Sequence, residues 1–249
     1  RKFLCSFMLL FLVLGCNTQQ EEPNNTHARI IGGAGLADGR FMTPRAIDAN
    51  EHVIVVIDKS GRLQLFNSNE DHMTTWDLPL SGTGYPTGVS LDPHGLIWVA
   101  ETHGHRVLVY DLAGKEVLRF GSYGTGDGKF LYPTDVAFGH NGEVYVSEYG
   151  GNDRISVFDR QGQFIRSFGH HGEDPKGFMR PQSIAVDPQT GNLMIADAGN
   201  HRIVVCDAVG KFLRLIACAG RDEGQLLYPY GISFVSRDSF LVCEYGNNR

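Results

Sequence analysis

The stretch "RPQSIAVDPQTGNLMIADAGNHRIVVCD", residues 180–207, decides the fold of this chain. It contains, in order, a proline, an apolar segment, a turn, a second apolar segment, an acidic residue and an arginine. The apolar segments are short, rich in β-branched residues and bounded by Gly, Asn, Asp and Pro, which is typical of strands and turns rather than helices. The stretch therefore predicts antiparallel strands joined by tight turns.

The same phrase recurs along the chain at a nearly constant spacing. Copies begin near residues 43, 85, 132, 180 and 228, and the copy from 43 is the weakest. Their prolines Pro86, Pro133, Pro181 and Pro229 are 47, 48 and 48 residues apart, and Pro44 lies 42 residues before Pro86. The copy from 132 has room for four strands, "TDVAFG", "EVYVSEY", "RISVFD" and "FIRSFG". Four antiparallel strands in each of several such repeats predict an all-β fold, a β-propeller of four-stranded blades.

Several of these segments resemble a known family. "DAGNHRIVVCD" (197–207) and "EYGGNDRISVFD" (148–159), with "GKFLYP" and "GFMRP" before the blade prolines, are similar to NHL repeats. The resemblance covers residues 29–249 and implies a six-bladed ring. About four and a half blades are present, so we expect an incomplete ring with the blade from 228 truncated. The resemblance implies little about chemistry, because this fold hosts binding modules and a few enzymes.

The segment before the first blade has its own place in this scheme. "ARIIGGAG" (28–35) parallels "VLRFGSYG" and "RLIACAG", each of which reads as the fourth strand of a blade running into a connector. In propellers an N-terminal strand commonly completes the last blade and so removes two exposed edges. We therefore predict a closing strand at residues 29–34.

The N-terminal residues predict export and a lipid anchor. "RKFLCSFMLLFLVLGC" (1–16) has two cations, an apolar run and a small residue before a cysteine, which is typical of an export signal. The "VLGC" ending resembles the lipobox of bacterial lipoproteins, which implies a lipid on Cys16; an ordinary secretory signal or a buried segment is the alternative. Residues 17–28 are polar and predict a flexible tether. We expect an extracytoplasmic protein of the bacterial cell envelope, anchored to a membrane through Cys16.

Charge and cysteine content narrow the possible partners. Without Arg1 and Lys2 the chain has 20 basic and 28 acidic residues, and the expected loop face bears several acids. Nucleic acid is therefore not expected as a partner. Cys206, Cys218 and Cys243 are an odd number for a disulfide framework, so we interpret them as small core residues without excluding one pair.

An acid and an arginine flank the turn between the second and third strand of most repeats. The pairs are Glu101 with Arg106, Glu148 with Arg154, Asp197 with Arg202 and Glu244 with Arg249. Facing residues beside such a turn lie within about 5.5 Å, so the arginine can reach the carboxylate. A catalytic role would require one copy to differ from the rest, and none clearly does. We interpret the pairs as hairpin clamps.

A second group of polar and aromatic residues is expected on the face formed by these turns and the connectors. The candidate ligand-face residues are His103, His105, Tyr149, His201 and Asp135. Asp135 is expected to line the central channel. The histidines have no regular metal-ligand spacing, so we predict no metal site.

Three site readings lack the residues that they require. The amidating lyases hold zinc with histidines just after the blade proline, whereas this sequence has there Arg45, Thr87, Thr134, Gln182 and Tyr230. Lactonase-like propellers use an acid and asparagines around a calcium, and here Thr87, Gln182 and Tyr230 complete no obvious cage with Asp135. "GTGDGKF" (124–130) is followed by no helix and lacks the Ser or Thr of a phosphate loop.

The sequence thus favours a binding scaffold over an enzyme. We predict a propeller without cofactor that presents its loop face to a protein, a peptide or a glycan. The alternative is a metal-dependent lyase or lactonase-like enzyme, with catalytic residues partly in blades outside this sequence.

Overall fold

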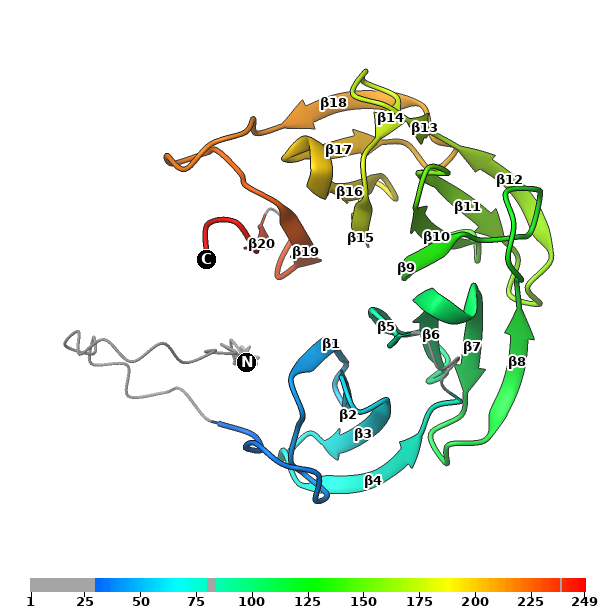
Figure 1. Ribbon diagram of the computed structural model, residues 1–249, viewed down its shortest axis with the longest axis vertical. Helices are drawn as coiled ribbons and strands as arrows, with labels where there is room; N and C mark the ends of the chain where they lie inside the picture. Colours follow the sequence, from blue (N-terminus) through cyan, green and yellow to red (C-terminus); the bar gives the residue numbers. More distant parts are fainter. Residues whose placement is uncertain (1–29, 80–83, 238) are drawn as a thin grey trace, which may run out of the picture.

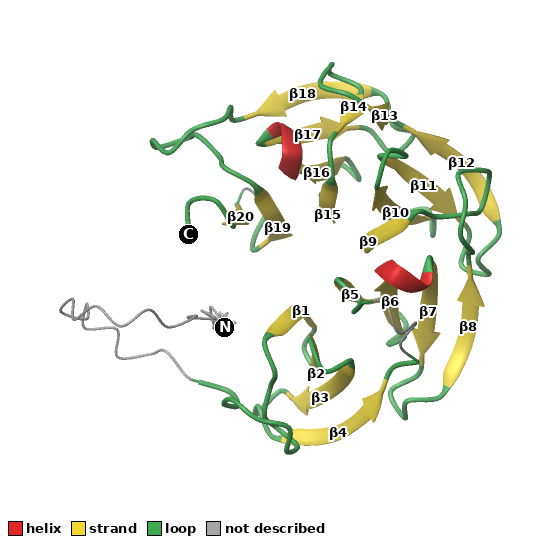
Figure 2. Ribbon diagram, in the orientation of Figure 1, coloured by secondary structure: helices red, strands yellow, loops and turns green. Residues whose placement is uncertain are grey.

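The structure, a computed structural model that describes residues 30–79, 84–237 and 239–249, consists of antiparallel sheets arranged around a central axis (Figure 1). In each four-stranded sheet the first strand lies nearest the axis and the fourth lies at the periphery. Strands dominate the described part of the chain (Figure 2). Among these residues no helix has the length and apolar character that crossing a membrane requires. The architecture is the β-propeller that the repeats predict.

The sheets follow the chain order. Blade one contains β1 (Pro44–Ala49), β2 (Val53–Asp58), β3 (Arg62–Asn67) and β4 (His72–Asp77). Blade two contains β5 (Gly88–Leu91), β6 (Ile97–Glu101), β7 (Arg106–Tyr110) and β8 (Glu116–Phe120). Blade three contains β9 (Tyr132–Phe138), β10 (Val144–Tyr149), β11 (Arg154–Phe158) and β12 (Phe164–Phe168). Blade four contains β15 (Pro181–Val186), β16 (Leu193–Asp197), β17 (Arg202–Cys206) and β18 (Phe212–Ile216). Blade five is a pair, β19 (Pro229–Phe234) and β20 (Phe240–Glu244).

The segments that lead into blades one, three, four and five share one short parallel contact. It is a single bridge from Ala34 to Phe41, from Tyr123 to Phe130 and from Ala219 to Leu226. Between blades three and four it extends to two residues on each side, β13 (His170–His171) and β14 (Gly177–Phe178). A Cβ at Gly121 would lie 2.5 Å from the Phe130 ring, and Gly121 has a φ of +89°, so the connector requires glycine there. The phenylalanine of "GKFLYP" therefore packs on the glycine that opens the same connector.

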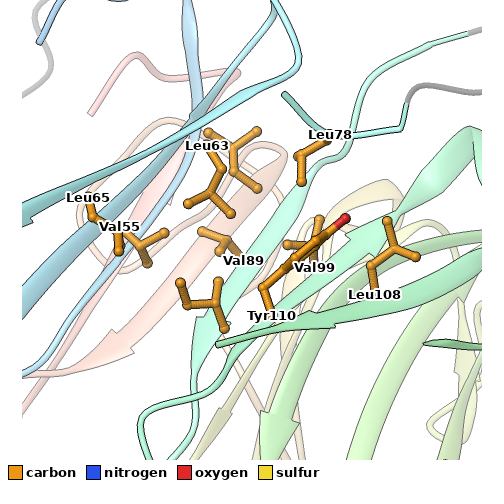
Figure 3. Close-up of a cluster of buried hydrophobic side chains, with 10 residues drawn as sticks. Val55, Leu63, Leu65, Leu78, Val89, Val99, Leu108 and Tyr110 are labelled. Carbon is orange, nitrogen blue, oxygen red and sulfur yellow. The ribbon is translucent and has the colours of Figure 1, made fainter. Parts of the chain in front are cut away.

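The hydrophobic core lies between neighbouring blades rather than within one sheet. In β6, Ile97 and Val99 pack toward blade one, whereas Trp98 and Ala100 pack toward blade three. This division follows from the strand pleat, which directs successive side chains to opposite faces. Figure 3 shows the cluster between blades one and two, with Val55 on one side and Val99 on the other. Because both faces of the inner strands are buried, their sequences are nearly continuous apolar runs.

The expected closing strand at residues 29–34 does not appear as a strand. Residues 30–33 belong to no sheet, and Ala34 makes only the connector bridge to Phe41. Ile30 is 90% exposed. A strand needs a partner for its backbone hydrogen bonds, and the described strands include no outer blade beyond β20 with which this segment could pair. In this structure residues 30–34 therefore form the entry to blade one, and their pairing with a last blade stays a prediction.

Candidate functional site

A central channel of about 700 Å³ runs between the first strands of the five blades. One residue from each blade follows the blade proline and lines it at one end: Arg45, Thr87, Thr134, Gln182 and Tyr230. This end is the loop face, because each first strand begins beside the acid that precedes the hairpin turn, as Pro133 does opposite Glu148. We call this end of the channel the mouth.

The predicted acid and arginine pairs are in contact in the structure. Nε of Arg154 lies 2.7 Å from a Glu148 oxygen, Nε of Arg202 lies 2.8 Å from Asp197, and Nε of Arg249 lies 2.7 Å from Glu244. Arg106 contacts Glu101 in the same way.

These pairs also hold the connector that precedes each blade. A Glu148 oxygen accepts the backbone N–H of Leu131 at 2.7 Å, and an Asp197 oxygen accepts that of Met179 at 2.7 Å. Burial raises the pKa of both carboxyls, and the hydrogen bonds oppose this shift. The hydrogen bonds that these two carboxyls make among the described residues run to their arginines, to nearby asparagines and to the connector, so the pairs join each hairpin to the connector before it.

Blade one has a clamp that the sequence did not reveal. Nη2 of Arg62 lies 3.0 Å from Asp58, and Asp58 accepts the backbone N–H of Met42 at 2.8 Å. Here the acid and the arginine are four residues apart, in "DKSGR", instead of five or six. Because the turn is shorter, the pair does not match the spacing of the other repeats. The acid at the end of the second strand could still have identified it.

The three candidate histidines pack against tyrosines of the adjoining connectors. The ring of His105 lies 4.9 Å from that of Tyr123, and its Nδ1 contacts the carbonyl oxygen of Leu131. The ring of His201 lies 4.3 Å from that of Tyr228, whose backbone N–H donates to His201 Nδ1 at 3.1 Å.

His103 differs slightly from the other two. Its ring lies 5.7 Å from Tyr132, and its Nδ1 is buried without a hydrogen-bond partner among the described residues. All three histidines are partly buried, and they border the loop face rather than converging on one point. Nowhere in the described ranges do three or more His, Cys, Asp or Glu side chains gather as a metal would require.

Tyrosine and arginine side chains gather around the mouth. The rings of Tyr132 and Tyr149 are stacked with centroids 5.1 Å apart. The guanidinium of Arg180 lies 5.1 Å from the centroid of Tyr149 and 5.8 Å from that of Tyr230. Burial raises the pKa of Tyr149, while the positive charges of Arg180 and Arg45 nearby lower it. We call Arg45, Tyr149, Arg180 and Tyr230 the rim.

The two arginines of the rim have no anionic partner. In the part of the chain that the structure describes, the guanidinium of Arg180 makes the two ring contacts and no ion pair, and that of Arg45 makes neither a hydrogen bond nor an ion pair. Both side chains are exposed. Arg180 also has a φ of +56°, an uncommon conformation for a residue with a side chain, and its N–H contacts Asp153 at 2.5 Å. This conformation helps to direct Arg180 over the rings.

Asp135 lines the channel, as the sequence predicts, and it links two blades. Its Oδ2 accepts the backbone N–H of Ile184 in the next blade at 2.9 Å, and Oδ1 accepts that of Val136 at 2.9 Å. Asp48 links blades one and two in the same way, because its Oδ2 accepts the backbone N–H of Leu91 at 2.7 Å. Burial raises the pKa of Asp135 to about 7, and the charge of Asp48 adds to the shift.

The cysteines form no disulfide among the described residues. Cys206 is buried, whereas Cys218 and Cys243 are exposed, and all three are free thiols. Burial raises the pKa of Cys206 to about 12. The interpretation as small core residues fits Cys206 and is wrong for the other two, which lie on the outer connector and at the channel wall.

Comparison with known proteins agrees with this fold. A family model described as "6-bladed beta-propeller" matches residues 138–220, and the NHL repeat model matches residues 83–110. Protein brain tumor of Drosophila melanogaster is 38% identical over 64 residues, which are 25% of this chain and 6% of that protein. The chain thus spans only a small part of the curated relative that it matches.

Solved structures show the same architecture at low identity. A streptogramin B lyase structure has a TM-score of 0.65 at 14% identity, covering 88% of this chain and 67% of that one. A chain of the nidogen/laminin complex has a TM-score of 0.64 at 17% identity, and the match covers 82% of this chain and 72% of that one. Virginiamycin B lyase from Staphylococcus aureus gives 0.61 at 16%, covering 81% of this chain and 63% of the lyase. At such identities the likeness shows the fold alone.

Fold and comparisons together define the class. The chain is an all-β propeller with four-stranded antiparallel blades, and parts of it match the models of a six-bladed propeller and of the NHL repeat.

Proposed function

We propose that this propeller is a binding scaffold whose ligand face is the rim at the channel mouth. The observation that supports this most directly is the contrast between two sets of arginines on one face. The clamp arginines, such as Arg154 and Arg202, are paired with carboxylates and connector carbonyls. Among the described residues Arg45 and Arg180 have no such partners, and the partly buried rings of Tyr149 and Tyr230 lie beside Arg180. Aromatic and arginine side chains are the residues enriched at binding hot spots.

The expected ligand is a protein, a peptide or a glycan outside the cytoplasm, and the expected anchor is a lipid on Cys16. Residues 1–28 lie outside the described part of the chain, so the anchor rests on the signal-like sequence alone. Intact-mass measurement of the membrane fraction tests it. A diacylglycerol mass on Cys16 is expected, and an unmodified soluble product would refute the anchor.

The binding proposal is tested on arrays of immobilised glycans and peptides with the full-length protein. Tyr149→Ala and Tyr230→Ala are expected to reduce binding to any recognised ligand by about tenfold or more, since buried aromatic anchors of an interface typically contribute about 2 kcal/mol each. Ile165→Ala is the matched control, because Ile165 is 46% exposed on the peripheral strand β12. Binding that is unaffected by both tyrosine variants would refute the rim as the ligand face. Turnover of an array compound, lost in the same variants, would favour the enzymatic alternative.

A further inference from the structure

The hydrogen-bonding groups left open at the mouth are donors. The amide Nε2 of Gln182 is buried and has no hydrogen-bond partner among the described residues, in a side chain that lines the channel and is 8% exposed. Gln182 stands between Thr134 and Tyr230 in the ring of residues that follow the blade prolines. The guanidinium groups of Arg45 and Arg180 add further N–H donors at the same level. A buried donor without a partner is costly, so an acceptor in the bound state would remove this cost.

Two backbone acceptors near the mouth are already occupied. The Thr134 carbonyl accepts the Thr87 hydroxyl at 3.2 Å, and the Pro181 carbonyl accepts the Thr134 hydroxyl at 2.8 Å. Deeper in the channel the oxygens of Asp135 are bound to backbone N–H groups of Ile184 and Val136. The site therefore has donors for a ligand and few free acceptors, which favours an anionic, acceptor-rich ligand.

The geometry of the inner strands disfavours an extended peptide as this ligand. A peptide that adds to a sheet edge needs free backbone groups on that edge. At three places on the channel side such a group is already bonded to a neighbouring blade: the N–H of Leu91 to Asp48, the N–H of Ile184 to Asp135, and the carbonyl of Val136 to Ser90. A ring-shaped group avoids this requirement, because it can lie on the tyrosine faces without backbone pairing. The channel volume of about 700 Å³ is within the usual size of a small-ligand pocket.

From these observations we propose that the rim binds an acidic sugar, a uronic acid residue of a glycan. Its carboxylate lies between the guanidinium groups of Arg45 and Arg180 and accepts from Gln182, and its pyranose ring lies against Tyr149 or Tyr230. Arginine suits this role because its planar donors match the two oxygens of a carboxylate. The inference rests on the proposed binding function and names the ligand class of the same site.

Calorimetric titration of the full-length protein with trigalacturonate tests this assignment. Three probes separate the contributions: trigalacturonate, its methyl ester, which keeps the rings and removes the charge, and N-acetylated triglycine, which keeps one carboxylate and removes the rings. Trigalacturonate is expected to bind, and each of the other two is expected to bind at least about tenfold more weakly. Raising the salt concentration is expected to weaken trigalacturonate binding, because exposed charges are screened.

The variants locate the carboxylate. Arg45→Gln and Arg180→Gln are each expected to lower the affinity for trigalacturonate by at least about tenfold. Arg180→Lys is expected to restore part of it, because the charge stays and the planar fork is lost. Arg214→Gln, the same charge change at an exposed site on the peripheral strand β18, is the matched control and should bind as the unaltered protein does. Thermal melts establish that each variant is folded.

Failure of the inference is distinguishable from failure of the binding proposal. Equal affinity for trigalacturonate and its methyl ester would overturn the carboxylate assignment, and equal affinity for acetylated triglycine would overturn the sugar assignment. Absence of trigalacturonate binding at millimolar concentration would overturn both assignments. Each of these results leaves the array experiment to decide whether the rim, through Tyr149 and Tyr230, binds a ligand of another class.

Discussion

Replacing Arg202 by alanine is expected to destabilise the propeller far more than replacing an exposed arginine. Arg202 donates from Nε to Asp197 at 2.8 Å. Its Nη atoms donate to the carbonyl oxygens of Glu173, Asp174 and Gly177 at 2.8, 2.8 and 2.9 Å. The side chains of Arg202 and Asp197 are 10% and 0% exposed. The arginine thus joins the hairpin of blade four to the connector before it.

The expected magnitude follows from what the substitution leaves behind. Without Arg202 the buried carboxylate of Asp197 has no opposite charge beside it, and removal of one partner from such a pair costs about 3–5 kcal/mol of unfolding free energy. Asp197→Ala combined with Arg202→Ala removes both charges. The double variant is therefore expected to lose less stability than the sum of the two single variants.

Urea unfolding followed by circular dichroism measures these differences. Arg119→Ala is the control, because Arg119 pairs with Glu116 at 2.7 Å while their side chains are 46% and 29% exposed. An exposed pair of this kind contributes about 0–1 kcal/mol. If Arg202→Ala cost no more than Arg119→Ala, or if the single and double variants were additive, the role assigned to the clamps would be refuted.

Two further predictions concern groups whose pKa is raised by burial. Burial raises the pKa of Asp135 from 3.8 to about 7, so the folded state binds this proton more tightly than the unfolded state does. The stability that this proton contributes is fully present below about pH 4 and is lost as the pH rises through 7. Between pH 4 and 7 the unfolding free energy of Asp135→Asn should therefore fall by less than that of the unaltered protein, with a difference on the order of 2–4 kcal/mol. Urea titrations at several pH values measure this, and parallel pH profiles for the two proteins would contradict it. The Cys206 thiol, with its pKa raised to about 12, should resist iodoacetamide in the native protein while Cys218 and Cys243 react. Peptide mass mapping distinguishes them, and rapid native labelling of Cys206 would show that its blade is not packed as described.

The blades could be predicted from the sequence because their determinants are local. Each strand, each hairpin turn and each acid and arginine pair is specified by residues close together in the sequence, and this pattern recurs at a nearly fixed spacing. The repeat also identified Asp135 as a channel residue, since its distance from Pro133 gives its place on the first strand. The clamp of Asp58 and Arg62 was missed because one turn is shorter.

The rim could not be predicted in the same way, although each of its residues was visible. From the sequence, Tyr149 was predicted to lie on the ligand face, whereas Arg45 and Tyr230 entered only the arguments against a metal site. Arg180 directly precedes a blade proline, and no role was predicted for it from the sequence. Its significance depends on a positive φ and on rings from two other strands, and neither is encoded in the repeat pattern.

By itself the sequence determined the all-β class, the four-stranded blades and their boundaries, because strand and turn signals are short-range and each repeat reinforces the others. Only the tertiary structure decided which side chains meet at the channel mouth. Arg45, Tyr149, Arg180 and Tyr230 come from different blades and connectors, far apart along the chain. Their proximity follows from the packing of blade against blade around one axis, which places one end of every first strand at the same opening.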